Sequence, residues 1–412
     1  MKKQRHLFQE MVDSFPKEVD LTDEEHSEII VKTVDFIIGN GYSVSDIENV
    51  EDEFIDSSID SNIFLLLALK IAKSKIAVSK VTDPLQISVI FAVYKEHNRI
   101  QHRTNHPHGE DFLLRKVEQL QWLFDGQTNI DWEMVIVDDG CPEESGKIAQ
   151  NIIDQNELNS YVRVLHLSDA IEQNLPPARG LSSTKESQKG GAVLYGLWDA
   201  VYHQKNENHI VVYTDADLST HLGQVMLLAE PLLKKDLLAA IGSRRKPNSV
   251  VIKNESRNNR GKLFIYLWKR IIPNLGDIID TQCGFKAFKA DIIKHIIDDL
   301  LEKKFAFDIE LLLKTELHKE DAIASIPIAW IDSEEASTTT DLQPYLPMLK
   351  SIAKMNRKYL PPSKESAEFV RFIESLDDVK FRKILNNIPQ NIVEREPLDF
   401  IEYNQVGVSD LM

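Results

Sequence analysis

Residues 211–220 read VVYTDADLST, a short apolar run that ends in two carboxylates, Asp215 and Asp217. Apolar runs of this length are typical of buried strands, and open parallel α/β sheets bind ligands at the carboxyl ends of their strands. Paired acids there suit a hard divalent cation, Mg²⁺ or Mn²⁺, held by few protein oxygens and by substrate phosphates. Taken alone, the pattern also fits a solvated turn or a helix cap, so its interpretation depends on its neighbours.

The composition describes an acidic globular protein. Its 412 residues carry 48 Lys and Arg against 65 Asp and Glu, a net charge of −17 that argues against nucleic acid as a partner. Two cysteines, Cys141 and Cys283, make no disulfide framework and favour a reducing compartment. The N-terminus lacks the apolar core of a secretory signal, and the most apolar run, 63–72, is too short to span a bilayer. We therefore expect a cytoplasmic protein with at most peripheral contact at the inner face of the membrane.

Short apolar runs alternate with helix-like stretches from residue 85 onward. This alternation predicts an α/β fold with a mainly parallel central sheet flanked by helices. Strands are expected at 87–93, 134–137, 162–167, 209–213 and 237–241, with shorter ones around 283–288 and 325–330. Helices are expected at 112–124, 145–156, 190–203, 222–235 and 257–272.

Helical extensions are expected on both sides of this region, over residues 1–82 and 361–412. A helix near 61–78 has an apolar face, which we expect to pack on the main domain because amphipathic helices usually bury that face. The alternative is that this face lies on a membrane surface, since several lysines flank it. The chain is thus divided into an N-terminal extension (1–82), a main domain (83–360) and a C-terminal tail (361–412).

Three of the expected strands end in functional-looking residues. The sequences are FAVYKE at 91–96, VIVDDG at 135–140 and TDADLS at 214–219. A nucleotide lying across this sheet edge needs an acceptor for base N–H groups, a flat group against the base and a cation for the diphosphate. Carboxylates, an aromatic ring and paired acids supply these three functions.

These segments belong to a longer ordered set of motifs that lies within residues 87–360. The set is ISVIFAVYKE (87–96), VIVDDG (135–140), KGGAV (189–193), TDADLST (214–220), IGSRR (241–245), DTQCGFKAF (280–288), FAFDIELL (305–312) and SIPIAWIDSEEAST (325–338). It resembles the inverting, metal-dependent nucleotide-sugar glycosyltransferases of family 2, which have the GT-A fold. Dolichyl- or polyprenyl-phosphate glucosyl- and mannosyltransferases are the most similar. The resemblance implies that residues 83–360 form a GT-A glycosyltransferase domain.

The resemblance also implies roles for individual residues. Asp217 would be the direct metal ligand, and Asp215 would contact the ribose or support the metal. The residues implied in nucleotide binding are Tyr94, Glu96, Asp138, Asp139, Lys189, Asp215, Arg244 and Arg257. One departure is Lys95, which puts a cation where the family has a neutral amide.

Asp280 is predicted to be the catalytic base, because displacement with inversion needs one base opposite the leaving group. It would take the proton of a hydroxyl acceptor, or orient an acceptor that is already ionised. Asp308 and Glu310 are alternatives for this role, and each could instead cap the helix that it begins. Without the resemblance, Asp280 would be interpreted as a turn residue.

The predicted function is transfer of a hexose, with UDP-glucose as the expected donor, to a polyprenyl phosphate or a soluble hydroxyl acceptor. Two other classes remain open. A sugar nucleotidyltransferase would carry a Gly-rich, Lys/Arg-bearing loop after the first strand, where this chain has AVYKEHNR. A non-catalytic nucleotide-sugar-binding assembly protein would not need Asp215, Asp217, Asp280 and the arginines together.

Overall fold

The computed structural model describes residues 2–57, 59–204, 206–252, 258–331, 344–400 and 405–412. A seven-stranded sheet lies at its centre in the order β3-β2-β1-β4-β7-β5-β8. Strand β7 pairs antiparallel with β4 and β5, and the other neighbours pair parallel. The strands are β1 (Leu85–Val93), β2 (Ile130–Asp138), β3 (Val162–His166), β4 (His209–Thr214), β5 (Ala239–Ser243), β7 (Phe285–Lys289) and β8 (Ile323–Pro327). The α/β fold with a mainly parallel sheet is confirmed.

A small parallel sheet pairs β6 (Val250–Ile252) with β9 (Ala329–Ile331) beside the main sheet. The expected stretch 325–330 therefore holds parts of two strands, β8 and β9, rather than one. The chain leaves the main sheet after Pro327, whose ring nitrogen carries no N–H for a sheet ladder. Strand β9 then crosses toward the loop that follows β4, where the backbone N–H of Ile331 donates to the Ser219 carbonyl at 2.9 Å.

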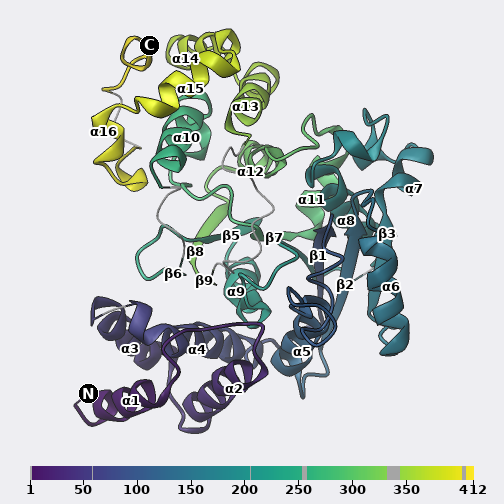
Figure 1. Ribbon diagram of the computed structural model, residues 1–412, viewed down its shortest axis with the longest axis vertical. Coiled ribbons are helices and arrows are strands. Elements are labelled where there is room, and N and C mark those ends of the chain that lie inside the picture. The colour runs from purple at the N-terminus through teal and green to yellow at the C-terminus, as the bar shows by residue number, and fades with distance from the viewer. Residues whose placement is uncertain (1, 58, 205, 253–257, 332–343, 401–404) are drawn as a thin grey trace.

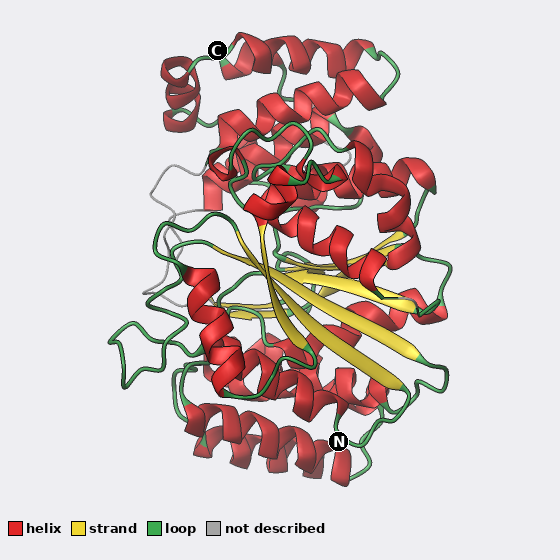
Figure 2. Ribbon diagram, turned by 90° about the vertical axis from the view of Figure 1, so that its right-hand side faces the viewer, coloured by secondary structure: helices red, strands yellow, loops and turns green. Residues whose placement is uncertain are grey.

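Helices cover both faces of the sheet because its residues alternate between two apolar layers (Figure 2). Val211 and Tyr213 of β4 face one layer, and Ile210 and Val212 face the other. The helices that follow the strands are α5 (Phe112–Phe124), α6 (Ser145–Gln155), α7 (Leu167–Glu172), α8 (Gly190–His203), α9 (Val225–Lys234), α10 (Asn258–Ile271), α11 (Ala290–Ile296) and α12 (Phe307–His318). Strands buried on both faces explain the continuous apolar runs in the sequence.

The N-terminal helices form a layer at one end of the molecule (Figure 1). They are α1 (Lys2–Ser14), α2 (Glu24–Gly39), α3 (Val44–Ser57) and α4 (Ile59–Val78). Residues 62–72 of α4 are all buried, and this helix packs on α9 and on the small sheet. Buried Lys70 pairs with Glu51 of α3 at 2.6 Å. The expectation that α4 packs on the main domain is confirmed, because its apolar side chains are enclosed within the protein.

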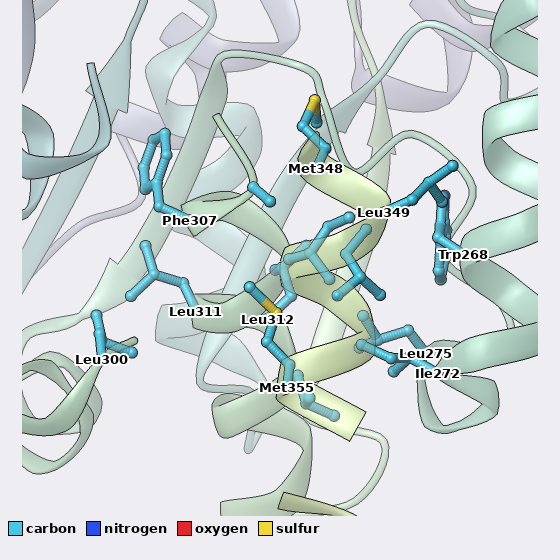
Figure 3. Close-up of a cluster of buried hydrophobic side chains, with 14 of the residues drawn as sticks. Trp268, Ile272, Leu275, Leu300, Phe307, Leu311, Leu312, Met348, Leu349 and Met355 are labelled. Carbon is cyan, nitrogen blue, oxygen red and sulfur yellow. The ribbon is translucent and has the colours of Figure 1, made fainter. Parts of the chain in front are cut away.

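The C-terminal helices pack around α10 at the opposite end (Figure 1). They are α13 (Tyr345–Tyr359), α14 (Lys364–Ser375), α15 (Asp378–Asn386) and α16 (Gln390–Val393). Figure 3 shows part of the apolar cluster that joins the C-terminal helices to the main domain. Trp268, Leu275, Leu312 and Leu349 all belong to this cluster. Within the described ranges, no helix is both long and apolar enough to cross a membrane. The division into 1–82, 83–360 and 361–412 stays a prediction.

A buried polar network crosses three strands near their amino ends. Ser88 of β1 donates to Glu133 of β2 at 2.7 Å, and its Oγ lies 2.9 Å from Nε2 of His209 on β4. Burial lowers the pKa of His209 to about 4, although the Glu133 carboxylate opposes this shift. His209 is therefore neutral in the folded protein at neutral pH.

The His209 network predicts a loss of stability in mild acid. His209 has a pKa of 6.5 in the unfolded chain and about 4 in the folded protein. Between these two pH values the unfolded chain therefore binds a proton that the folded protein does not bind. The free energy of unfolding should fall across this window by about 3 kcal/mol from His209. Urea unfolding between pH 4 and 7.5 measures it, and His209→Gln should flatten the slope. Parallel pH profiles for the two proteins would contradict the assignment.

Candidate active site

The sheet brings the three strand ends of the sequence analysis to one edge. Strands β2, β1 and β4 are parallel neighbours, so Asp139, Tyr94 and Asp215 follow adjacent carboxyl ends. Strand β7 runs the opposite way, with Phe285 paired to Thr214 of β4. Its first residues therefore lie at the same edge, and they bring the loop that carries Asp280. This antiparallel strand explains how a motif so distant in sequence joins the site.

Asp139, Lys189 and Asp215 form a connected group. The backbone N–H of Lys189 donates to Asp139 Oδ2 at 2.6 Å, and its ammonium pairs with Asp215. Lys189 has φ 83°, which a side-chain-bearing residue adopts only when its surroundings hold it there. Although burial opposes it, the carboxylates of Asp215 and Asp308 raise the pKa of Lys189. Lys189 thus fixes the spacing between two acids that end different strands.

One carboxylate oxygen of Asp139 makes no hydrogen bond to the described residues. This oxygen, Oδ1, is buried. Burial raises the pKa of Asp139 to about 6, against the effect of the Ser187 and Lys189 hydrogen bonds. A buried acceptor without a donor is costly, so such an atom in a native fold calls for a ligand. The oxygen suits an N–H group of a nucleobase.

Asp138 has a structural role that the sequence did not predict. Its carboxylate accepts from the backbone N–H groups of Gly140 at 2.8 Å, Cys141 at 2.9 Å and Gly146 at 2.7 Å. These bonds shape the turn after β2 and the first turn of α6. Both oxygens are engaged, so nucleotide contact by Asp138 stays a prediction that this geometry does not favour.

Glu96 belongs to a buried ion-pair network with two residues that the sequence analysis missed. Arg99 donates to Glu96 at 3.0 Å and to both oxygens of Glu110 at 2.9 and 3.1 Å. Its guanidinium also lies 3.7 Å from Asp217 Oδ2. Burial raises the pKa of Glu96 to about 7 despite Arg99. Arg99 thereby joins the end of β1 to the acidic pair after β4.

Tyr94 is positioned differently from these buried groups. Its side chain is 46% exposed at the rim, and the Lys95 ammonium lies 5.7 Å from its ring centroid. An exposed ring beside a buried acceptor is suited to stacking on a base. Lys95 adopts φ 61°, which turns the chain directly after β1.

Asp217 is the acid best placed to hold a metal ion. Its Oδ1 accepts from the backbone N–H of Ser219 at 3.1 Å and from the hydroxyl at 2.5 Å, while the side chain stays 28% exposed. Asp215 is neutralised by Lys189 and is less suited to a second cation. No group of three or more His, Cys, Asp or Glu side chains within the described residues forms a metal cage. The donor set fits a Mg²⁺-type site with one carboxylate and substrate phosphates.

Gly284 packs directly against the Asp215 carboxylate, where a larger residue would not fit. A Cβ atom on this residue would lie 2.2 Å from Asp215 Oδ2, far inside contact distance, and the Asp215 N–H donates to the Gly284 carbonyl at 3.1 Å. The segment DTQCGFK therefore needs a glycine at position 284, because a side chain there would clash with the Asp215 carboxylate of the segment TDADLST.

Gly284→Ala should lower the free energy of unfolding by about 1–3 kcal/mol, the usual range for overpacking a buried site. Urea unfolding measures the change. Gly39→Ala is a matched control, because a Cβ there would meet nothing within 4 Å apart from its chain neighbours and the backbone of its own helix. Equal stability of the two variants would show that Asp215 does not occupy the position described.

Arg244 and Asp280 form a bidentate ion pair. Arg244 donates through Nε at 2.9 Å and Nη2 at 2.8 Å, and its backbone N–H adds a third bond at 2.8 Å. Although burial opposes it, Arg244 lowers the pKa of Asp280 to about 2. A carboxylate with so low a pKa is a poor proton acceptor near neutral pH. The role of base stays a prediction for Asp280, and Arg257 lies outside the described residues.

The two alternative bases have structural contacts. Asp308 is buried and accepts from Tyr213 and, at 3.2 Å, from Lys286. Glu310 accepts from three groups, the N–H of Leu301 and of Glu302 at 2.7 Å each and the hydroxyl of Tyr359 at 2.5 Å. Glu310 therefore holds the loop before α12, which makes it unsuited to proton transfer.

The glycines of KGGAV also serve packing. The N–H of Gly191 donates to the Lys303 carbonyl at 2.7 Å, and a Cβ on Gly190 would lie 2.4 Å from the Lys304 carbonyl oxygen. These glycines let the loop before α12 approach the start of α8. Because the N–H of Gly191 is already bonded, the start of α8 has one N–H group fewer to offer to an anion.

Comparison with known proteins identifies the class of this protein. Residues 88–296, about half of the chain, match the family described as Glycosyl transferase family 2. With the sheet described above, this match defines a glycosyltransferase with the GT-A fold. The chain belongs to glycosyl transferase family 2. The enzyme class and fold expected from the sequence are confirmed.

Similar curated proteins are glycosyltransferases. Glycosyltransferase AglD of Haloferax volcanii is 24% identical over 258 residues, which cover 63% of this chain but only 35% of that protein. The dolichyl-phosphate beta-glucosyltransferase of Homo sapiens is 26% identical over 280 residues, or 67% of this chain and 76% of that protein. The Saccharomyces cerevisiae enzyme of the same name is 26% identical over 293 residues, or 68% and 76%.

Among solved structures, glucosyl-3-phosphoglycerate synthase from Mycobacterium tuberculosis is similar. The complex with Mn²⁺, uridine-diphosphate and glucosyl-3-phosphoglycerate has 20% sequence identity and a TM-score of 0.46. The match covers 71% of this chain and 85% of that one.

Proposed function

We propose that this protein transfers glucose from UDP-glucose to a polyprenyl phosphate, with inversion and with Mg²⁺ or Mn²⁺. The observation that carries the proposal is the gathering of Asp139, Asp217 and Arg244 at one sheet edge. They offer a base acceptor, a metal ligand and a phosphate-binding cation. The similar dolichyl-phosphate beta-glucosyltransferases support the sugar and the acceptor.

In this proposal Tyr94 stacks on the uracil ring and Asp139 Oδ1 accepts its N–H. Arg244 binds the diphosphate through a planar guanidinium suited to phosphate oxygens. The bound metal, held by Asp217, would neutralise charge on the diphosphate. An acceptor oxygen attacks the anomeric carbon while the bond to the diphosphate breaks, and the electron pair leaves with UDP.

The surroundings of Asp280, Asp308 and Glu310 favour a sugar acceptor that is already ionised. Asp280 has a pKa near 2 and is bound by Arg244, while Asp308 and Glu310 have structural contacts. A phosphate monoester has a second pKa of about 6, so most of it is doubly ionised at neutral pH and needs no base. A polyprenyl phosphate therefore fits this site better than a soluble hydroxyl compound. Such an acceptor also implies peripheral contact with the inner face of a membrane for an otherwise cytoplasmic protein.

A transfer assay tests the proposal. Protein, UDP-glucose and Mn²⁺ are incubated with a short-chain polyprenyl phosphate or with the corresponding polyprenol, and products are separated by chromatography. We expect a glucosyl lipid from the phosphate alone. Transfer confined to soluble hydroxyl acceptors would contradict the proposal that the acceptor is a polyprenyl phosphate. UDP binding without transfer to any acceptor would favour a nucleotide-sugar-binding protein.

A further inference from the structure

We infer that Trp330 on β9 is a positioning residue that fixes the Arg244 guanidinium toward the donor diphosphate. This inference rests on the proposed function, because it assigns Arg244 to that diphosphate. The sequence assigns no role to Trp330 beyond its place in the segment 325–338.

Arg244 is held from two directions. Asp280 binds one edge of the guanidinium with two bonds of 2.8 and 2.9 Å. The guanidinium also lies over the ring of Trp330, with Arg244 Cζ 5.2 Å from the ring centroid. The carboxylate fixes one edge of the guanidinium but leaves rotation about that edge, and the cation–π contact with Trp330 restricts this rotation. Together the two contacts set the orientation of a side chain that remains 24% exposed.

The strand that carries Trp330 is itself fixed. The buried side chain of Gln224 binds both backbone groups of Ala329, accepting from its N–H at 2.8 Å and donating to its carbonyl at 2.9 Å. On the other side of Trp330, the Ile331 N–H donates to the Ser219 carbonyl at 2.9 Å. The ring is therefore attached to a backbone position with little freedom.

Strand β9 also connects the two halves of the proposed diphosphate site. Ser219, which binds Ile331, donates to Asp217 Oδ1 through its own N–H and hydroxyl. Next along the strand, Trp330 contacts Arg244. Successive residues of one short strand thus support the metal-binding acid and the phosphate-binding cation, and β9 sets the spacing between them.

The test is a double-mutant cycle with UDP and UMP as ligands, measured by calorimetry with Mn²⁺. Trp330→Leu should weaken UDP binding about fivefold, the scale of one partly buried cation–π contact. UMP binding, which lacks the second phosphate, should change little, and Trp330→Phe should restore most UDP affinity. In an Arg244→Met protein, Trp330→Leu should have less than about half of this effect because the cation that contacts the ring is gone.

Trp132→Leu is the matched control, since this tryptophan lies near the amino end of β2 and packs on Tyr161. It should leave both affinities unchanged. Equal losses for UDP and UMP, or the same loss with and without Arg244, would overturn the positioning role. Failure of the wild-type protein to bind UDP would instead overturn the proposed function, and the inference with it.

Discussion

The Asp217→Asn protein is expected to lose transfer activity by about a hundred- to a thousandfold, the range for removing one preorganised electrostatic group from an active site. Asparagine keeps the shape of the side chain and both serine contacts, but it removes the charge that holds the cation. The metal-dependent stabilisation by UDP should disappear with it, because a ligand stabilises only the state that binds it. Glucose transfer and thermal shift with UDP and Mn²⁺ measure these effects.

Asp131→Asn is a control of equal charge change, because Asp131 is exposed at the amino end of β2, away from the site. It should retain activity. An Asp217→Asn protein with near-normal, metal-dependent transfer would move the metal to other residues.

Asp280→Asn is expected to weaken UDP binding at least about tenfold as well as to lower the rate, because Asp280 no longer holds the Arg244 guanidinium in place for the diphosphate. Asparagine leaves Arg244, whose side chain is 24% exposed, without its counter-charge, so the protein should also unfold more easily. Calorimetry with UDP and urea unfolding measure the two effects. Replacing both partners, as Arg244→Met with Asp280→Asn, should recover much of the stability but not the UDP affinity.

A different result with Asp280→Asn would support the sequence-based prediction that Asp280 is the catalytic base. Loss of transfer with unchanged UDP affinity in Asp280→Asn is the behaviour of a catalytic base. It would favour a hydroxyl acceptor, whose proton must be removed, over an acceptor that is already ionised.

The fold was largely predictable because strands buried on both faces leave continuous apolar runs. The runs at 87–93, 134–137 and 209–213 all lie within observed strands. The direction of β7 was not predictable, since an apolar pattern carries no information on strand direction. This direction matters, because it brings the Asp280–Gly284 loop to the site.

The site was predictable only in part. Asp138 and Asp139 are adjacent and chemically identical, yet one binds three backbone N–H groups and the other keeps a free oxygen. Arg99 and Glu110 lie in a charged stretch that resembles a solvated loop, although both are buried. Their partners are fixed by tertiary packing, which periodicity and composition do not report.

In the proposed function, acids and an arginine that follow separate strands bind one metal-complexed nucleotide diphosphate. Calorimetric titration of the wild-type protein with UDP, with and without Mn²⁺, tests it most directly. We predict binding with one site per chain that requires Mn²⁺ and is abolished by chelation with EDTA. Absence of UDP binding, or equal affinity with and without the metal, would rule out a metal-dependent nucleotide site at this sheet edge.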